Sequence, residues 1–73
     1  MAMVQGMVAR LAERLKVEGS DVDGWLQLLR SYMVLGEREN ALAAAANARR
    51  ALASDADKLR RVNELIKGLG LEG

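Results

Sequence analysis

The sequence predicts an all-α domain of four helices that pair in antiparallel fashion. Glycine and small polar residues divide the chain at residues 18–21, 35–37, 53–55 and 68–70, and the segments between these breaks carry apolar residues at helical spacing. The chain has 73 residues, of which 51% are hydrophobic, and this suffices for one small folded core. We therefore expect a single domain over residues 1–73, with helices at about 3–16, 21–35, 38–53 and 55–69.

The first predicted helix has one apolar face and one charged face. Its apolar residues lie three or four positions apart, which is the spacing that lines one buried side of a helix. The charged residues Arg10, Glu13, Arg14 and Lys16 fall on the other side. The stripe expected to be buried consists of Val4, Met7, Val8, Leu11 and Leu15.

The second predicted helix, residues 21–35, is apolar on most of its circumference. Ser20 is the expected N-cap, and Gly36 is the expected left-handed residue that ends the helix. A helix of this kind is normally covered on more than one side. The inward stripe comprises Trp25, Leu28, Leu29, Tyr32 and Leu35, and beside it runs a second apolar line of Leu26, Met33 and Val34, interrupted by Arg30.

The third and fourth predicted helices present faces of different width. The third is rich in alanine, which has the highest helix propensity, and its small side chains let a neighbouring helix approach closely. The fourth carries bulkier residues on its inner side. The faces expected to be buried are Ala41, Ala44, Ala45, Ala48 and Leu52 in the third helix and Leu59, Val62, Leu65, Ile66 and Leu69 in the fourth.

The start of the second helix recurs at the start of the fourth. The stretch "SDVD" occupies residues 20–23 and "SDAD" occupies residues 54–57, and the same shift carries Trp25 onto Leu59 and Gly36 onto Gly70. A shift of this size, about 34 residues with two helices per unit, is typical of the tetratricopeptide repeat. The chain resembles that family at Trp25, Leu28, Tyr32, Gly36, Ala41 and Ala48.

This resemblance implies a fragment of a tetratricopeptide solenoid, with half a repeat, one full repeat at about 22–55, and a further half. Two positions depart from the family pattern. Leu29 stands where a small residue is usual, and Ala45 stands where an aromatic residue is usual. We expect a size exchange across the helix pair, in which Leu29 fills the space that Ala45 leaves, because a core tolerates changes that conserve its total volume.

A longer stretch resembles one particular family of repeat proteins. "MVARLAERL" at residues 7–15, followed by "DGWLQLLRSYMVLGERENALAA" at residues 23–44, is similar to the repeat domain of the CycH-type cytochrome c biogenesis proteins. The resemblance implies a module in the bacterial periplasm, belonging to a membrane-anchored parent, that holds apocytochrome c before haem attachment. Without this resemblance, a cytoplasmic location is expected.

Composition argues against several other classes of function. The chain contains no cysteine or histidine, so it offers no disulfide, the usual zinc ligands are missing and a haem would have only methionine as axial ligand. Its net charge of +1 does not favour nucleic-acid binding, and no apolar run reaches the roughly 20 residues that span a bilayer. The aspartates at 21, 23, 55 and 57 fit helix caps and first turns. We expect no enzyme activity, no cofactor and no metal.

The resemblance to tetratricopeptide proteins also implies a binding surface. In that family the first helix of each pair lines the concave face and meets peptide ligands. Leu26, Met33 and Val34 would then accept an apolar side chain, while Arg30 and Arg60 would hold a carboxylate. The partner-binding residues expected from the register are Asp23, Leu26, Arg30, Met33, Val34, Arg60, Glu64 and Lys67.

A structural role in self-association is the alternative interpretation. Repeat arrays bury each unit against its neighbours, so a short array exposes apolar surface at its ends. We therefore expect a homodimer or weaker oligomer that covers Leu26, Met33 and Val34, and on this interpretation the chain has no separate ligand. Trp25 and Tyr32 are expected to be core residues under either interpretation, and the pairs Arg49–Arg50 and Arg60–Arg61 are expected to be solvated.

Overall fold

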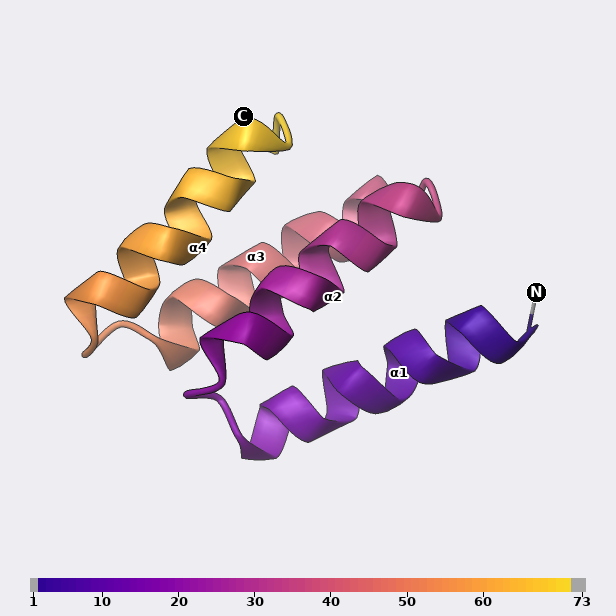
Figure 1. Cartoon of the computed structure of the whole chain (residues 1–73), viewed down its shortest axis with the longest axis horizontal. Coiled ribbons are helices and arrows are strands. Elements are labelled where there is room, and N and C mark those ends of the chain that lie inside the picture. The colour runs from indigo at the N-terminus through magenta and orange to yellow at the C-terminus, as the bar shows by residue number, and fades with distance from the viewer. Residues whose placement is uncertain (1, 72–73) are drawn as a thin grey trace.

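The computed structural model describes the backbone of residues 2–71 and the side chains of residues 6–71. These residues form the helices α1 (Ala2–Val17), α2 (Val22–Val34), α3 (Arg38–Ala51) and α4 (Ala56–Gly68). Successive helices alternate in direction, with α1 and α4 on opposite sides of α2 (Figure 1). Helix α2 packs on each of the other three, and α3 also packs on α4. The prediction of an all-α domain with four helices is confirmed.

Helix α1 packs through a narrower face than its sequence predicts. Val8 and Leu15 are buried, and Leu11 and Ala12 pack against the core from its edge. The prediction that Met7 is buried is wrong, because its side chain is 65% exposed. In α1 the buried seam follows the spacing 8, 11, 12 and 15, and Met7 lies beside that seam, facing solvent. The side chain of Val4, the remaining member of the predicted stripe, lies outside the described side chains.

Gly24 allows α1 to approach the first turn of α2 closely. A Cβ atom at this position would lie 2.8 Å from Cδ2 of Leu15 and 2.9 Å from a carboxylate oxygen of Asp21. The junction is reinforced by the guanidinium of Arg14, which donates a 3.0 Å hydrogen bond to the same carboxylate. Nε1 of Trp25 donates a 2.9 Å hydrogen bond to the carbonyl of Gly19 in the connecting loop. The buried indole is therefore satisfied and also fixes the loop.

The N-cap of α2 is Asp21, so the expectation that Ser20 caps this helix is wrong. The Asp21 carboxylate accepts a 3.1 Å hydrogen bond from the backbone N–H of Gly24, as an N-cap side chain does. The helix begins one residue later than the position that Ser20 would cap. Ser20 instead contributes its carbonyl, which accepts a 2.9 Å hydrogen bond from Nζ of Lys58 at the start of α4.

The ends of α2 recur in α4 at the shift that carries Asp21 onto Asp55. Asp55 caps α4 by accepting a 3.1 Å hydrogen bond from the N–H of Lys58. Gly36 and Gly70 both have a φ of 72°, in the left-handed region that suits glycine. Each glycine is part of a Schellman motif, which has two backbone hydrogen bonds. In the first motif the N–H groups of Gly36 and Glu37 donate to the carbonyls of Met33 and Tyr32. In the second, the N–H groups of Gly70 and Leu71 donate to the carbonyls of Lys67 and Ile66.

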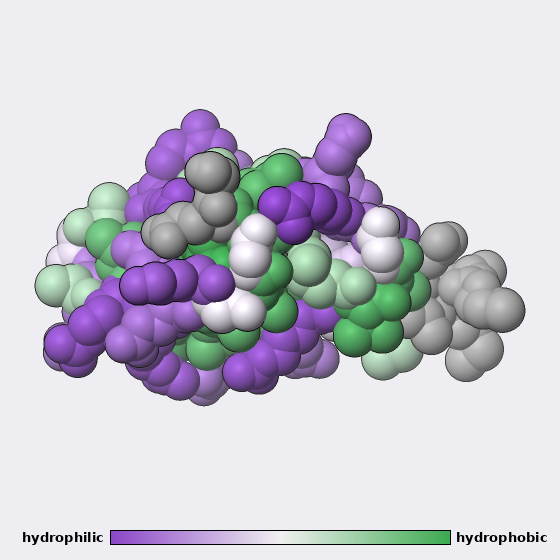
Figure 2. Space-filling model, turned by 90° about the horizontal axis from the view of Figure 1, so that it is seen from above, coloured by the Kyte–Doolittle hydropathy of each residue, from purple (hydrophilic) through white to green (hydrophobic). Residues whose placement is uncertain are grey.

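A single apolar core lies between the helices. Trp25, Leu28 and Leu29 from α2 are buried with the alanine face of α3 and with Val62 and Ile66 from α4. Leu29 and Ala45 belong to this same core, which the proposed exchange of size between them requires. Six residues of the predicted stripes are only partly buried at its edge: Leu11, Tyr32, Leu35, Leu59, Leu65 and Leu69. Figure 2 shows hydrophobic residues reaching the surface among hydrophilic ones on the face seen there.

Substituting Gly36 by alanine should destabilise the fold, whereas Gly68→Ala should not. Holding alanine in the left-handed conformation costs about 1–2 kcal/mol. Gly68 lies in α4 without a positive φ, and an added Cβ would meet no atom within 4 Å, so Gly68→Ala should stabilise the fold by about 0.5–1 kcal/mol. Urea unfolding followed by circular dichroism measures both changes. Equal effects of the two substitutions would contradict the assignment of Gly36 as a conformational requirement.

Candidate functional site

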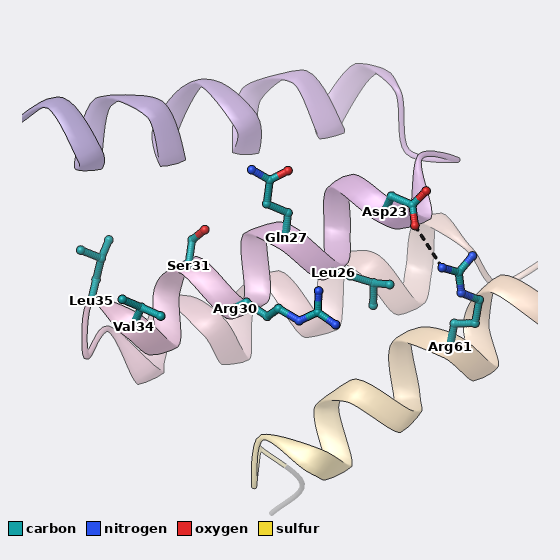
Figure 3. A pocket seen from close by; sticks show the side chains of 8 residues that line it. All are labelled: Asp23, Leu26, Gln27, Arg30, Ser31, Val34, Leu35 and Arg61. Carbon is teal, nitrogen blue, oxygen red and sulfur yellow. Dashed lines mark hydrogen bonds and ion pairs between the residues drawn. The ribbon is translucent and has the colours of Figure 1, made fainter.

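A groove of about 590 Å³ lies between α2 and α4. We refer to it as the α2–α4 groove. Figure 3 shows that its side chains come almost entirely from α2, with one arginine contributed by α4. The α2 side supplies Asp23, Leu26, Gln27, Arg30, Ser31 and Val34, followed by Leu35 at the C-cap. Helix α4 supplies Arg61.

The helical spacing of α2 explains why these residues share one surface. Positions three and four apart on a helix lie above one another, so residues 23, 26, 27, 30, 31 and 34 form one continuous face. Leu26 is 9% exposed and forms an apolar floor, whereas Val34 is 86% exposed at the far end. Arg30 lies between these two residues, and its guanidinium extends into the space toward α4 (Figure 3). The groove therefore places one cation between two apolar contacts.

The two arginines of the groove differ in their partners. The guanidinium of Arg61 forms a 3.0 Å ion pair with Asp23 across the groove. Both side chains are largely exposed, so the pair contributes no more than about 1 kcal/mol to stability. Within residues 6–71, no hydrogen bond or ion pair engages the side chain of Arg30. Arg30 is thus the cation in this groove that is available to an incoming carboxylate.

The structure places seven of the eight expected binding residues on two separate surfaces and the eighth, Met33, on neither. Asp23, Leu26, Arg30 and Val34 lie together in the α2–α4 groove. Met33 is partly buried against the core and does not line the groove. The other three, Arg60, Glu64 and Lys67, line a separate depression of about 340 Å³ on α4. Their spacing of four and three residues places them on one face of α4, apart from the groove.

Four groove residues were not expected from the sequence. Gln27 lies four residues after Asp23, and Ser31 lies four residues after Gln27. The helical spacing of α2 could therefore have placed both residues on the same face as Asp23. Leu35 was assigned to the buried stripe, but it is only partly buried and also lines the groove. Arg61 was expected to be solvated. Its place opposite Asp23 depends on how α4 crosses α2, and no local pattern in the sequence specifies that crossing.

Trp25 and Tyr32 lie on the side of α2 that faces away from the α2–α4 groove. The expectation of a core position is confirmed for Trp25, which is 3% exposed, whereas Tyr32 is only half-buried. Burial raises the pKa of the Tyr32 phenol above its ordinary value of 10.0. The negative charge of Glu37 raises this pKa further, and the positive charge of Lys16 opposes the rise.

The described part of the chain offers neither a metal cluster nor a membrane-spanning helix. Among those residues, no group of three or more histidine, cysteine, aspartate or glutamate side chains is placed to hold a metal ion. None of the described helices combines the length and the apolar character needed to cross a membrane.

Comparison with known proteins finds two relatives. The chain is 54% identical over 72 residues to the cytochrome c-type biogenesis protein CycH of Bradyrhizobium diazoefficiens, covering 99% of the chain and 20% of that protein. It is 37% identical over 71 residues to CycH of Rhizobium meliloti, covering 97% of the chain and 19% of that protein. The chain thus spans about a fifth of the length of these relatives. No family model matches the chain, and no solved structure matches it.

The raised pKa of Tyr32 should make the fold less stable in alkaline solution. A folded-state pKa above the unfolded value of about 10 stabilises the fold at lower pH, and this contribution is lost as the pH rises through the raised pKa. Absorbance titration near 295 nm should place the midpoint of the one tyrosine above that of the urea-unfolded chain. Tyr32→Phe should flatten the decline in unfolding free energy above pH 10. Coincident folded and unfolded midpoints would contradict the burial of this phenol.

Proposed function

The chain is homologous to a segment of the CycH cytochrome c-type biogenesis proteins over nearly its whole length, and from this we propose that it acts in cytochrome c maturation as a peptide-binding module. The bound segment would lie in the α2–α4 groove. We assign the module to the tetratricopeptide type, an assignment supported by the helix caps and Schellman motifs that recur between α2 and α4.

One observation carries the proposal of a peptide ligand. Arg30 is an exposed cation with no partner among the described residues, and it lies between the apolar side chains of Leu26 and Val34. A guanidinium binds a carboxylate through two parallel hydrogen bonds, while the neighbouring apolar surface favours an aliphatic or aromatic side chain. The groove therefore suits a segment that carries a carboxylate next to an apolar residue. Apocytochrome c is the ligand that we propose.

Arg61 is better placed than Arg60 to provide the second cation. Arg61 lines the α2–α4 groove, whereas Arg60 lies in the depression on α4 beside Glu64 and Lys67. Because Arg61 is paired with Asp23, a ligand carboxylate would compete with Asp23 for it. We propose that Arg30 makes the primary contact and that Arg61 contributes through this exchange.

The module has a holding role and no catalytic role in this proposal. Its setting would be the bacterial periplasm, where the parent protein would keep apocytochrome c accessible before haem is attached. The charged groups near the groove, Asp23, Arg30 and Arg61, are exposed at the surface, and such groups suit reversible contact with a polypeptide.

Arg30→Ala should weaken binding of an apocytochrome c C-terminal peptide by about tenfold or more. Hydrogen bonds to a charged group contribute about 1.5–3 kcal/mol, and about 1.4 kcal/mol corresponds to a factor of ten in Kd. Titration calorimetry measures the change, and circular dichroism should show unchanged helicity. Arg10→Ala is the matched control, because Arg10 is exposed on α1 and lines neither the groove nor the depression on α4. Equal affinity of the wild-type and Arg30→Ala chains would refute the groove as the peptide site.

Self-association without a ligand is the competing role, and the same variant separates the two. Leu26 is already buried within the chain and Met33 is partly buried, so Val34 is the member of the apolar line that remains exposed. This leaves little apolar area for a dimer contact along that line. In place of the homodimer expected from the sequence, we therefore expect sedimentation velocity over a range of concentrations to show a monomer. If Arg30→Ala changed the oligomeric state and left peptide binding intact, self-association would be the better account.

A further inference from the structure

A second groove lies on the opposite side of α2, between α1 and α3. It has a volume of about 570 Å³, within the range of ligand sites. We refer to it as the α1–α3 groove. Trp25, Leu28 and Tyr32 line it from α2. Since successive helical residues are rotated by about 100°, this face of α2 points away from the face that carries Leu26 and Arg30.

The small residues of α3 explain why this space is open. Ala43, Ala44 and Ala51 face the groove, and a methyl group is too short to reach across to α1. Helix α1 makes its main contacts with α2, so no second layer of described side chains closes the gap. At one end the groove is sealed, because a Cβ atom on Gly19 would lie 3.0 Å from Cβ of Ala51. Toward the other end it meets a depression of about 350 Å³ that shares Tyr32 and Asn40.

The charged side chains that line the α1–α3 groove are both cations, and the nearest carboxylates are Glu13, paired with Lys16, and Glu37, which lines the adjoining depression. Lys16 from α1 and Arg50 from α3 line it, and none of the described carboxylates does. Lys16 forms an ion pair with Glu13 at 3.5 Å, but both side chains are more than half exposed, so that pair is weak. Arg50 donates a hydrogen bond to the neutral side chain of Asn47, which leaves its positive charge unmatched. An apolar floor with two cations at the rim is complementary to an apolar side chain flanked by carboxylates.

We propose that the α1–α3 groove is a second protein-binding site, which takes an acidic amphipathic segment of a partner protein. One large apolar side chain of that segment enters between α1 and α3 above Trp25, and its acidic neighbours contact Lys16 and Arg50. The site is separate from the α2–α4 groove and does not depend on the function proposed for it. Two partners can therefore occupy opposite sides of α2 at the same time.

Nuclear magnetic resonance of the 73-residue chain tests this proposal directly. The probe is an acetylated and amidated peptide of sequence Glu-Glu-Leu-Phe-Glu-Glu-Leu, and its counterpart carries lysine in place of each glutamate. Trp25 is the one tryptophan of the chain, so its indole N–H gives a single signal that reports on the floor of the groove. The acidic peptide should shift this signal and the amides of Ala43, Asn47 and Arg50. The basic peptide should leave them unchanged.

Two pairs of variants locate the contact. Ala43→Leu fills the groove and should weaken binding of the acidic peptide about tenfold or more, whereas Ala46→Leu on the exposed, groove-free side of α3 should not. Arg50→Gln should also weaken binding, while Arg10→Gln should not. Both arginines are exposed, so their substitution tests the charge requirement without disturbing the core.

Four results would overturn the proposal. The first is an absence of shifts with either peptide, and the second is equal binding of the acidic and basic peptides. The third is a set of shifts centred on Leu26 and Arg30, which would place the peptide in the α2–α4 groove. The fourth is a shift of the same groove signals with protein concentration alone, abolished by Ala43→Leu, which would show that a second copy of the chain covers this surface.

Discussion

Helix α2 has to bury residues on several sides at once, and the rest of the structure depends on that constraint. It packs on α1, α3 and α4, and six of its thirteen residues are buried. The three neighbouring helices pack on α2 with side chains of different sizes. Leu15 of α1 lies against the bare backbone of Gly24, the alanine face of α3 lies close along it, and Val62 and Ile66 of α4 complete the core. Among the described helices, no other packs extensively on all of the remaining three.

The ends of α2 fix where its neighbours begin. Asp21 both caps α2 and binds Arg14 of α1, so one carboxylate joins the end of one helix to the start of the next. The indole of Trp25 fixes the same loop through Gly19. At the other end, the Schellman motif at Gly36 reverses the chain into α3. Helix α4 has the same kind of ends, with Asp55 as its N-cap and Gly70 in the left-handed conformation after its last turn. In addition, Arg38 at the start of α3 donates a 2.9 Å hydrogen bond to the carbonyl of Gly70. Similar local chemistry thus gives two helices of equal length.

The central position of α2 also explains why the molecule has two grooves of different character. The α2–α4 groove combines Arg30, which has no partner among the described residues, with the exposed ion pair of Asp23 and Arg61. The α1–α3 groove combines a buried aromatic floor with two cations and small walls. Both grooves exist because the neighbouring helices pack against α2 but leave the space beside that contact unfilled. The fold therefore leaves a groove on each of two opposite sides of α2.

The sequence by itself determined the number and type of the helices, most residues of the main core and the recurrence of the caps and glycines of the second helix in the fourth. These features follow from local causes: helical spacing of apolar residues, capping carboxylates and glycines that adopt a positive φ. The tetratricopeptide resemblance placed eight residues on one surface, and four of them, Asp23, Leu26, Arg30 and Val34, line the α2–α4 groove together. Only the tertiary structure decided four other features. These are the exposure of Met7, the pairing of Arg61 with Asp23, the separation of Arg60 from the α2–α4 groove, and the open space beside α3. Each depends on the distance or crossing of two helices, which is set by packing between residues far apart in the chain.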